Sequence, residues 1–343
     1  MSITMEELGR KLGLSRQTIS RVVHNHHNVK PETRRKVQQA MKRFGYRPNL
    51  LARSLAQNRR NAIGIVMPRG GEMLFNPYFS RIIAGIGIEA KQGGLTPVFY
   101  FPKDSSGPRY RLFEMIRDGR VDGGLVIEEE NIDKLTLNRI EKDNYPLIIL
   151  NTHLPDKEIN WICADDEGGT YRAVEHLIKL GHRRIVYLRG FDNSNTSDER
   201  LRGYRKALQD NGISYNKRLV ANSEFLSEVA YRKTLEYINS KVKFTAICAG
   251  NDLAAFGAIK ALKEKGLKVP QDIAVVGYDD FDFASMVSPT ITTIKQPLLK
   301  MGKLAVAKLL KIIESKKGER VQQVLKTELI LRESCGGIKL KEK

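Results

Sequence analysis

The sequence is poor in cysteine and has no long apolar run. Only three cysteines occur among 343 residues, at Cys163, Cys248 and Cys335. Cys163 and Cys248 lie in apolar segments, which is typical of buried free thiols and not of a disulfide framework. No apolar run approaches the roughly 20 residues that a membrane-spanning helix needs. The N-terminus lacks the basic and apolar regions of a signal peptide. We therefore expect a protein of the reducing cytoplasm with no membrane partner.

Patterns that carry catalysis are also missing. The chain has no Ser/His/Asp or Cys/His arrangement and no phosphate-binding glycine loop. The acidic pairs at 165–166 and 279–280 are adjacent in sequence, and neighbours on a strand point to opposite faces. The histidines within residues 24–27 lie in a turn without a nearby cysteine or acid, so contact with phosphate or solvent is favoured over a metal site. We expect no enzyme activity, no metal and no cofactor.

Acidic residues are scarce in the first 60 positions, which hold 14 Lys and Arg against 3 Asp and Glu. This segment carries +11 of the chain's net charge of +19, and the rest carries only +8. Such a density of positive charge indicates a polyanion as partner. With 41% hydrophobic and 28% charged residues, the whole chain has the composition of globular domains. Its length predicts two or three of them.

The basic segment has the pattern of a helix-turn-helix unit. A short helix is predicted over Met5–Leu12, with Thr4 as its N-cap and Gly13 at its end. A second helix is predicted over Arg16–Val23, after Ser15 as N-cap. Its apolar residues can face inward and leave arginine and glutamine outward. These side chains have the planar donor and acceptor groups that read base edges in the major groove.

A third helix is predicted over residues 31–44, with an apolar stripe at helical spacing and Gly45 at its end. Residues 50–57 could form a further helix, too short to hold alone because isolated helices below about 12–15 residues are marginal in water. A generic basic three-helix bundle would share the first part of this pattern. The extension past Gly45 makes the pattern specific.

From Ala62 onward, short apolar strands alternate with amphipathic helices. Strands are predicted at 62–67, 96–101, 123–127, 147–151, 161–164, 185–188, 246–249 and 273–276, and helices at 78–92, 109–117, 169–180, 198–211, 229–240 and 253–265. The alternation predicts parallel sheets covered by helices on both faces, in two similar sets before and after about residue 160. Ligands of such folds bind at the carboxyl ends of the strands, which here means between two lobes.

These segments resemble the LacI–GalR family of bacterial transcription regulators. The matching residues include 13–15, 18–23, 33–37 and 45–55 in the basic segment, and 63–68, 76–79, 199–204, 275–280 and 289–296 further on. The resemblance covers nearly the whole chain. It implies an N-terminal all-α helix-turn-helix head joined to an α/β two-lobed core like that of periplasmic binding proteins.

The resemblance also implies how the chain is divided. Residues 1–46 would form the DNA-binding domain, 47–61 a hinge helix and linker, 62–335 the effector-binding and dimerisation core, and 336–343 a disordered tail. The N-lobe would comprise about 62–160 and 291–321, and the C-lobe about 161–290 and 322–335. The chain would cross between lobes near Trp161, Pro289 and Gln322. No leucine heptads follow Cys335, so a tetramer built by the tail is not expected.

For DNA, the resemblance implies that the second helix enters the major groove and that the hinge helix enters the minor groove with Leu55 as a wedge. Arg16 stands at a variable reading position, so the operator sequence stays open. The residues expected at DNA are Thr4, Ser15, Arg16, Gln17, Thr18, Ser20, Arg21, His24, Asn28, Tyr46, Asn49, Ala52 and Leu55.

For the effector, the resemblance implies that Arg200 grips ligand oxygens, because a guanidinium fork suits a hydroxyl pair, a carboxylate or a phosphate. Asp279 would accept from sugar hydroxyls or a base amine, and aromatic rings could stack on an apolar ligand face. Each side chain could instead be a structural cap or an interlobe contact. The expected set is Asn76, Phe191, Arg200, Phe225, Asn251, Asp279 and Gln296.

A sugar or sugar phosphate is the expected effector class. Residues 68–76 form a longer loop than is usual in the family, with Arg69 where Asp is common. The extra arginine hints at an acidic or phosphorylated effector, although a surface loop without this role is an equal alternative.

The expected function is a ligand-responsive, sequence-specific DNA-binding regulator, in particular a repressor of carbohydrate-related genes. It would bind a pseudo-palindromic operator as a homodimer, because two-fold protein symmetry imposes symmetry on the site. Whether the effector induces or co-represses stays open. The alternatives are a solute-binding protein with a basic head and a sugar-processing enzyme such as a kinase. The +11 head argues against the first, and the missing catalytic patterns argue against the second.

Overall fold

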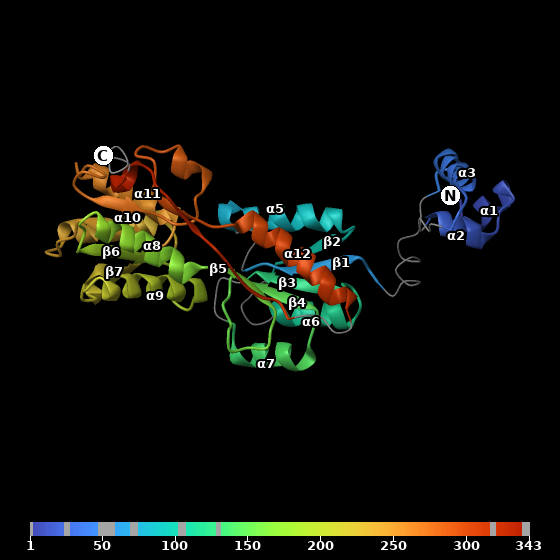
Figure 1. Cartoon of the computed structure of the whole chain (residues 1–343), viewed down its shortest axis with the longest axis horizontal. Helices are drawn as coiled ribbons and strands as arrows, with labels where there is room; N and C mark the ends of the chain where they lie inside the picture. Colours follow the sequence, from blue (N-terminus) through green and yellow to red (C-terminus); the bar gives the residue numbers. More distant parts are fainter. Residues whose placement is uncertain are drawn as a thin grey trace. The chain divides into compact units, whose positions relative to one another are not determined.

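The computed structural model describes residues 3–23, 28–46, 59–68, 75–101, 108–127, 132–315 and 320–337. By its internal contacts the chain divides into two units, Met1–Asn61 and Ala62–Lys343, which we call the head and the core (Figure 1). The possible hinge helix over residues 50–57 lies outside the described residues. None of the described helices is long and apolar enough to cross a membrane.

The head contains the three predicted helices, α1 (Met5–Leu12), α2 (Arg16–Val23) and α3 (Pro31–Arg43). Thr4 caps α1 in a capping box: its hydroxyl accepts from the backbone N–H of Glu7 at 3.2 Å, and its own N–H donates to the Glu7 carboxylate at 2.7 Å. Gly13 ends α1 in the left-handed region, at φ 65°. The three helices close on a small apolar core of Leu8, Ile19, Val22, Val37, Ala40 and Tyr46.

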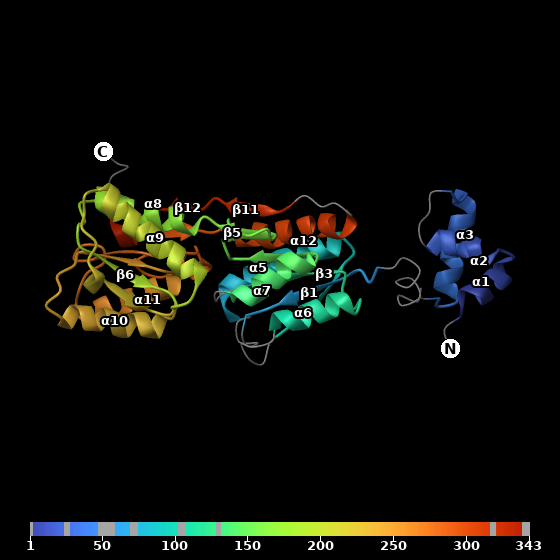
Figure 2. The same cartoon turned by 90° about the horizontal axis from the view of Figure 1, so that it is seen from below.

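The first lobe of the core, the N-lobe, is built on six parallel strands in the order β11-β5-β4-β3-β1-β2. The strands are β1 (Ala62–Val66), β2 (Thr96–Tyr100), β3 (Gly123–Ile127), β4 (Leu147–Leu150), β5 (Trp161–Ala164) and β11 (Gln322–Leu325). Helices α5 (Pro77–Gln92) and α12 (Leu298–Glu314) cover one face, and α6 (Pro108–Arg117) and α7 (Lys134–Asp143) cover the other (Figures 1 and 2).

Side chains of the N-lobe strands alternate between the two faces of the sheet, so each face receives apolar residues. Ile63 and Ile65 of β1 are buried against α5 and α12, while Val66 packs with the opposite cluster. Two glycines let α5 and α12 approach closely. A Cβ atom on Gly85 would lie 2.2 Å from a backbone oxygen of α12, and one on Gly302 would lie 2.1 Å from a backbone oxygen of α5.

The second lobe, the C-lobe, repeats the plan with four parallel strands in the order β7-β6-β8-β9. The strands are β6 (Ile185–Arg189), β7 (Val220–Asn222), β8 (Ala246–Ala249) and β9 (Ala274–Val276). Helices α8 (Asp166–Lys179) and α9 (Asn195–Asp210) cover one face, and α10 (Ser227–Asn239) and α11 (Asp252–Glu264) cover the other. A small antiparallel pair, β10 (Thr293–Lys295) with β12 (Glu328–Ile330), completes this lobe. The predicted two-lobed α/β fold is confirmed.

The strand pairing moves the expected lobe boundaries. Residues 161–164 and 322–325, expected in the C-lobe, form β5 and β11 and pair with each other in the N-lobe sheet. The chain therefore crosses after these strands and not before them. The second crossing also comes later, because isolated bridges from the C-lobe segment Val276–Asp279 reach Thr292 and Lys295. An apolar strand pattern does not reveal which sheet the strand joins, so only the pairing fixes these points.

Every strand and helix predicted in the core occurs, with ends that differ by a few residues. The sequence prediction omitted α7, α12, β7, β10, β11 and β12. The missing strands have three or four residues, and each contains polar residues. The equally short strands that were predicted, such as β5 and β8, are wholly apolar. Helix α12 is different, because its buried residues recur at helical spacing and its sequence pattern could have identified it.

Candidate functional site

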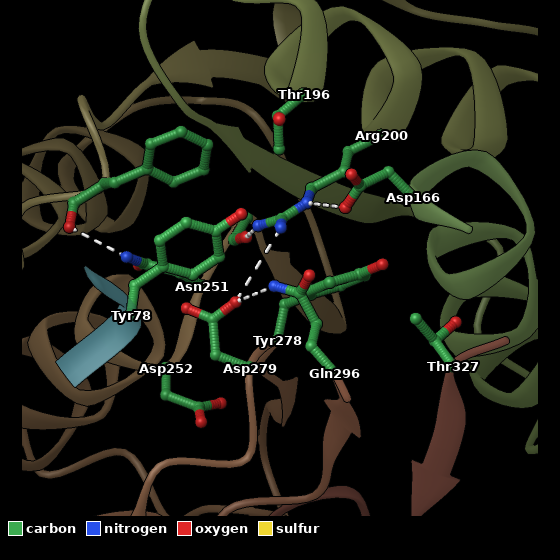
Figure 3. A network of polar contacts seen from close by, with 12 residues as sticks. Tyr78, Asp166, Thr196, Arg200, Asn251, Asp252, Tyr278, Asp279, Gln296 and Thr327 are labelled. Carbon is green, nitrogen blue, oxygen red and sulfur yellow. Dashed lines mark hydrogen bonds and ion pairs between the residues drawn. The ribbon is translucent and has the colours of Figure 1, made fainter. Parts of the chain in front are cut away.

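A pocket lies between the two lobes, at the carboxyl ends of their strands. About 440 Å³ of it is not filled by protein atoms, part of it open to solvent. The N-lobe contributes the start of α5, and the C-lobe contributes segments that follow β6, β7, β8 and β9 (Figure 3). The position agrees with the rule for open parallel sheets. The lining residues are Asn76, Tyr78, Phe79, Ser194, Thr196, Arg200, Phe225, Asn251 and Asp279.

Arg200 occupies the centre of the C-lobe side of this pocket and is only 2% exposed. Its Nε donates to Asp166 at 2.7 Å and its Nη1 to the carbonyl of Gly250 at 2.6 Å. Its Nη2 lies 3.7 Å from Oδ1 of Asp279, and the guanidinium stacks on the ring of Tyr278 at 3.8 Å (Figure 3). The guanidinium is thus held in one orientation by the protein itself.

Asp279 follows β9 in an unusual backbone conformation, with φ 111°, and Asp280 follows at φ 55°. The N–H of Asp279 donates to the carbonyl of Ile294 at 2.7 Å, and Oδ1 of Asp279 accepts from Nε2 of Gln296 at 2.6 Å. Burial raises the pKa of Asp279 to about 7, against the opposing effects of Arg200 and the Gln296 amide. The strained turn therefore holds a nearly buried carboxyl group toward the pocket.

Two further carboxyl groups lie buried close to this pair. Burial also raises the pKa of Asp166, although Arg200 opposes the shift. Asp252, at the start of α11, accepts from the Thr293 hydroxyl at 2.6 Å and from the N–H of Phe281 at 2.8 Å. Burial raises the pKa of Asp252 well above its usual range. The site therefore combines one guanidinium with three carboxyl groups.

The two predicted asparagines line the pocket and also cap helices. Oδ1 of Asn76 accepts from the N–H of Tyr78 at 3.0 Å at the start of α5. Asn251 caps α11 through the N–H of Ala254 at 2.8 Å and donates from Nδ2 to the carbonyl of Phe225 at 3.0 Å. These roles match the structural alternative that the sequence left open, and they coexist with a place at the pocket wall.

The aromatic predictions divide between the wall and the support behind it. Phe225 lines the pocket, in the left-handed region at φ 57°. Its ring lies against Gly190 and Gly250, where a Cβ atom would come within 2.0 Å and 3.1 Å of ring carbons. Phe191 packs edge-on against Phe225 at 5.7 Å and is not among the described lining residues. Gln296 likewise stands behind the wall, bonded to Asp279.

Sequence reasoning missed four lining residues. Tyr78 and Phe79 follow Asn76 at the start of α5, inside a motif that carried the family resemblance, so the signal was present. Ser194 is the N-cap of α9 and Thr196 lies in its first turn, directly after the loop that follows β6. Loops that follow parallel strands were the signal that could have found them.

Polar contacts also join the lobes beside the pocket. Thr196 donates to the carbonyl of Asn151 at 3.2 Å, from the C-lobe to the segment after β4. Nearby, Nδ1 of His153 lies 3.0 Å from the Glu199 carboxylate. From α5, Nη1 of Arg81 donates to the backbone carbonyl of Asp280 at 2.8 Å. The pocket is therefore flanked by contacts that depend on how the lobes meet.

The head exposes one face of α2. Arg16, Gln17 and Arg21 are exposed on it, whereas Ile19 and Val22 are buried beneath. Of the other residues predicted at DNA, Ser15 caps α2 by accepting from the N–H of Thr18 at 3.1 Å, Ser20 is half-buried, and Thr4 and Asn28 are exposed. Tyr46 is only 8% exposed and packs in the core of the head. His24, Asn49, Ala52 and Leu55 lie outside the described residues.

Two family models match the chain. Residues 4–49 match bacterial regulatory proteins of the lacI family, and residues 174–335 match the periplasmic binding protein-like domain. The HTH-type transcriptional regulator CelR of Thermobifida fusca is 32% identical over 335 residues, which cover 96% of this chain and 98% of that protein. The chain belongs to the LacI family. It is therefore a DNA-binding transcription regulator and not an enzyme, and the predicted family is confirmed.

Other LacI-family proteins match over the same length. The HTH-type transcriptional repressor PurR of Photobacterium profundum is 31% identical over 96% of this chain and 98% of its own. A lac repressor dimer bound to operator and the anti-inducer ONPF superposes with a TM-score of 0.84 at 31% identity, over 97% of this chain and 99% of that one. A CelR–cellobiose complex superposes with a TM-score of 0.73 at 29% identity, over the same shares.

Proposed function

We propose that this LacI-family protein is a cytoplasmic repressor of carbohydrate-related genes that binds a pseudo-palindromic operator as a homodimer. A small sugar-like effector in the interlobe pocket would change its affinity for that operator. One observation carries the proposal: the same chain has an exposed face of arginine and glutamine on α2 and a polar pocket between two lobes. The operator-bound lac repressor dimer and the CelR–cellobiose complex support it.

On the DNA side, Arg16, Gln17 and Arg21 would read base edges in the major groove, because they share the exposed face of α2. The surrounding lysines and arginines would contact phosphates and release counterions, which makes binding depend steeply on salt. Leu55 would enter the minor groove from the hinge and kink the DNA.

On the effector side, a hydroxyl group would bridge the gap of 3.7 Å between Arg200 and Asp279, accepting from the guanidinium and donating to the carboxylate. Asn251 and Thr196 would offer further polar atoms, and Phe225 a ring for the apolar face of a sugar. The pocket is lined by side chains from both lobes. A ligand there would therefore have a different affinity for open and closed conformations of the core. That difference in affinity shifts the conformational population and, with it, DNA binding.

Mobility-shift titration of the DNA upstream of the gene and its neighbours tests the DNA side. We expect saturable binding to a pseudo-palindromic site at physiological salt, with scrambled DNA bound at least a thousandfold more weakly. Equal affinity for the scrambled sequence would contradict the proposal. Adding candidate sugars to the same titration tests the effector side, and the direction of the change separates an inducer from a co-repressor.

The hinge assignment has its own test in Leu55→Ala. Removing the wedge should weaken specific binding and leave effector binding intact, because the pocket belongs to the core. Unchanged operator affinity in the variant would rule out the wedge role of Leu55.

A further inference from the structure

Polar contacts join the two lobes along a seam beside the pocket, between the segment that follows β4 in the N-lobe and the first turns of α9 in the C-lobe. Oγ1 of Thr196 donates to the carbonyl of Asn151 at 3.2 Å. The N–H of His153 donates to Oδ1 of Asn195 at 3.0 Å. A third contact places Nδ1 of His153 3.0 Å from Oε1 of Glu199. These contacts exist only while the lobes meet at this seam.

Of these three contacts, only the one between His153 and Glu199 joins two ionisable side chains. The side chain of Glu199 is 8% exposed, whereas that of His153 is 32% exposed and can be reached by water. Burial raises the pKa of Glu199, the hydrogen bond from His153 opposes this shift, and the charge of Asp166 adds to it. The contact therefore pairs a nearly buried acid of one lobe with a base of the other lobe.

The groups around this pair come from both lobes. In the N-lobe, His153 packs edge-on against Trp161, with ring centroids 4.9 Å apart. Burial and nearby acids raise the pKa of the Cys163 thiol on the same strand, so it stays neutral. In the C-lobe, Arg202 donates to the same oxygen of Glu199 and keeps its charge at any ordinary pH. Because imidazole is the side chain that changes charge near neutral pH, the charge at this seam depends there on His153.

We propose that His153 and Glu199 form a proton-controlled latch, which draws the lobes together as the pH falls from about 8 to about 6. A neutral imidazole donates a hydrogen bond to Glu199, and an imidazolium adds a positive charge to that bond. A charged donor roughly doubles the strength of such a bond. When the lobes part, His153 faces water and loses this partner. Proton uptake by His153 therefore favours the arrangement in which the lobes meet.

The separation of the lobes can be measured with spin labels on cysteines introduced at Lys142 of α7 and Gln209 of α9, which are both exposed. The three native cysteines are buried. Pulsed dipolar spectroscopy of the full-length protein, without effector or DNA, compares the distance between labels at about pH 8 and about pH 6. We expect the ratio of the shorter to the longer distance to rise about fivefold, because doubling an ordinary hydrogen bond shifts an equilibrium by about this factor. An unchanged distribution would overturn the proposal.

Two variants test whether the pair itself causes this response. His153→Gln keeps a hydrogen-bond donor but cannot gain a charge, so its distances should be the same at both pH values. Glu199→Gln removes the carboxylate from the other lobe and should lose the response as well. The matched control is His182→Gln, because His182 precedes β6 at the end away from the seam and bonds to Thr245 at 3.0 Å. The control should respond like the parent protein. A His153→Gln protein with the parent's response would rule out the latch.

Trp161 provides a second measurement that needs no label. It is the single tryptophan of the chain, and a protonated imidazole in contact with an indole ring quenches its fluorescence. We expect the fluorescence of the parent protein to fall between about pH 8 and about pH 6, and that of His153→Gln to stay constant. Constant fluorescence in the parent protein would mean that His153 takes up no proton in this range, and the proposal would fail.

The latch concerns the lobes alone, and only its consequence for operator affinity rests on the proposed function. Mobility-shift titrations of the same preparations therefore separate the two proposals. If a specific operator is bound while the lobes ignore pH, only the latch fails. If the lobes respond to pH and no specific operator is bound, the repressor function fails and the latch stands.

Discussion

Arg16 and Arg21 in the head are exposed on one face of α2, whereas Arg200 in the core is 2% exposed and touches two carboxyl groups. The first 60 residues have many more lysines and arginines than acidic residues. In the core pocket, Arg200 is instead matched by the buried carboxyl groups of Asp166 and Asp279. The two ends of the same regulator therefore use the same residue type under different physical conditions.

The difference lies in how water and salt weaken each charge. Exposed charges act at high dielectric, so each contact is modest, roughly additive and reduced by salt. A buried charge interacts strongly with a few fixed partners, and removing one partner leaves the others desolvated and unpaired. We expect head variants to change DNA binding without affecting the fold, and pocket variants to affect both the fold and the ligand.

Replacing the buried arginine should have the largest effect. Arg200→Ala leaves Asp166 and Asp279 without their cation, and breaking such a buried pair costs about 3–5 kcal/mol. We expect the free energy of unfolding of the core to fall by this amount, measured by urea titration of the fluorescence of the single tryptophan, Trp161. The effector response should be lost, while operator binding persists wherever the variant is folded.

The matched control is Arg218→Ala, an exposed arginine of the same lobe. It should stay within about 0.5 kcal/mol of the parent protein. Equal unfolding midpoints for the Arg200 and Arg218 variants would show that the buried network does not stabilise the core.

Replacing an exposed arginine of the head should have the next largest effect, and on a different quantity. Arg21→Ala should weaken operator binding by about 1–3 kcal/mol if Arg21 reads a base edge, and relax the preference at that base pair. A phosphate contact would instead weaken binding to all sequences alike and reduce the salt slope by about 1. Mobility-shift titrations at several salt concentrations distinguish these outcomes. A change in the urea midpoint of the core would contradict the separation between head and core.

The contrast between head and pocket also explains how far the sequence could be read. The cap at Thr4, the turn at Gly13 and the apolar stripe of α2 are local features, so the pattern of residues determined them. The buried partners of Arg200 are not local, because Asp166 and Asp279 come from different elements that meet only after the sheet has formed. Periodicity carries no information about such meetings.

The same limit applies to the lobes. An apolar run predicts a strand but not its partner strand, so β5 was placed in the wrong lobe. Residues 322–325, which form β11, were not predicted as a strand and were placed in the C-lobe with the residues that follow them. The resemblance supplied Arg200, Asp279 and the asparagines as candidates. It did not supply Ser194 and Thr196, which reach the pocket because the loop after β6 ends there.

Changing the charge of Asp279 should have an effect that depends on pH. Burial raises the pKa of Asp279 in the folded protein to about 7, whereas the unfolded value is about 3.9. Between these values the folded state binds more protons than the unfolded state, so this group's contribution to stability falls as pH rises. Asp279→Asn removes that contribution. Its free energy of unfolding should therefore rise relative to the parent protein as the pH increases from about 4 to about 7.

Urea titrations across this range measure the trend, with Asp282→Asn as the control because Asp282 is 83% exposed. The control should show no comparable trend. A constant difference between Asp279→Asn and the parent protein at all pH values would mean that Asp279 titrates normally in the folded state.

The smallest effect is expected at the ion pair between Arg81 and Asp282, which joins the two lobes. It is exposed like the arginines of the head, but it lies in the core like Arg200. Nη2 of Arg81 lies 2.6 Å from Oδ1 of Asp282, with side chains 29% and 83% exposed. Exposed pairs contribute about 0–1 kcal/mol, so Asp282→Asn should hardly change the free energy of unfolding. The pair nevertheless joins α5 of the N-lobe to a C-lobe turn. Its loss should weaken the affinity for a sugar that closes the lobes by up to about fivefold, the factor that corresponds to 1 kcal/mol.

A double-mutant cycle with Arg81→Met and Asp282→Asn isolates this coupling, because it subtracts the other contacts of Arg81. A coupling energy in effector affinity that exceeds the coupling energy in stability would show that the pair acts on lobe closure. Equal coupling energies in the two measurements would mean that it only supports the fold, like the exposed pairs elsewhere on the surface. The exposed pair would then differ from the exposed arginines of the head, whose contribution appears only when DNA is bound.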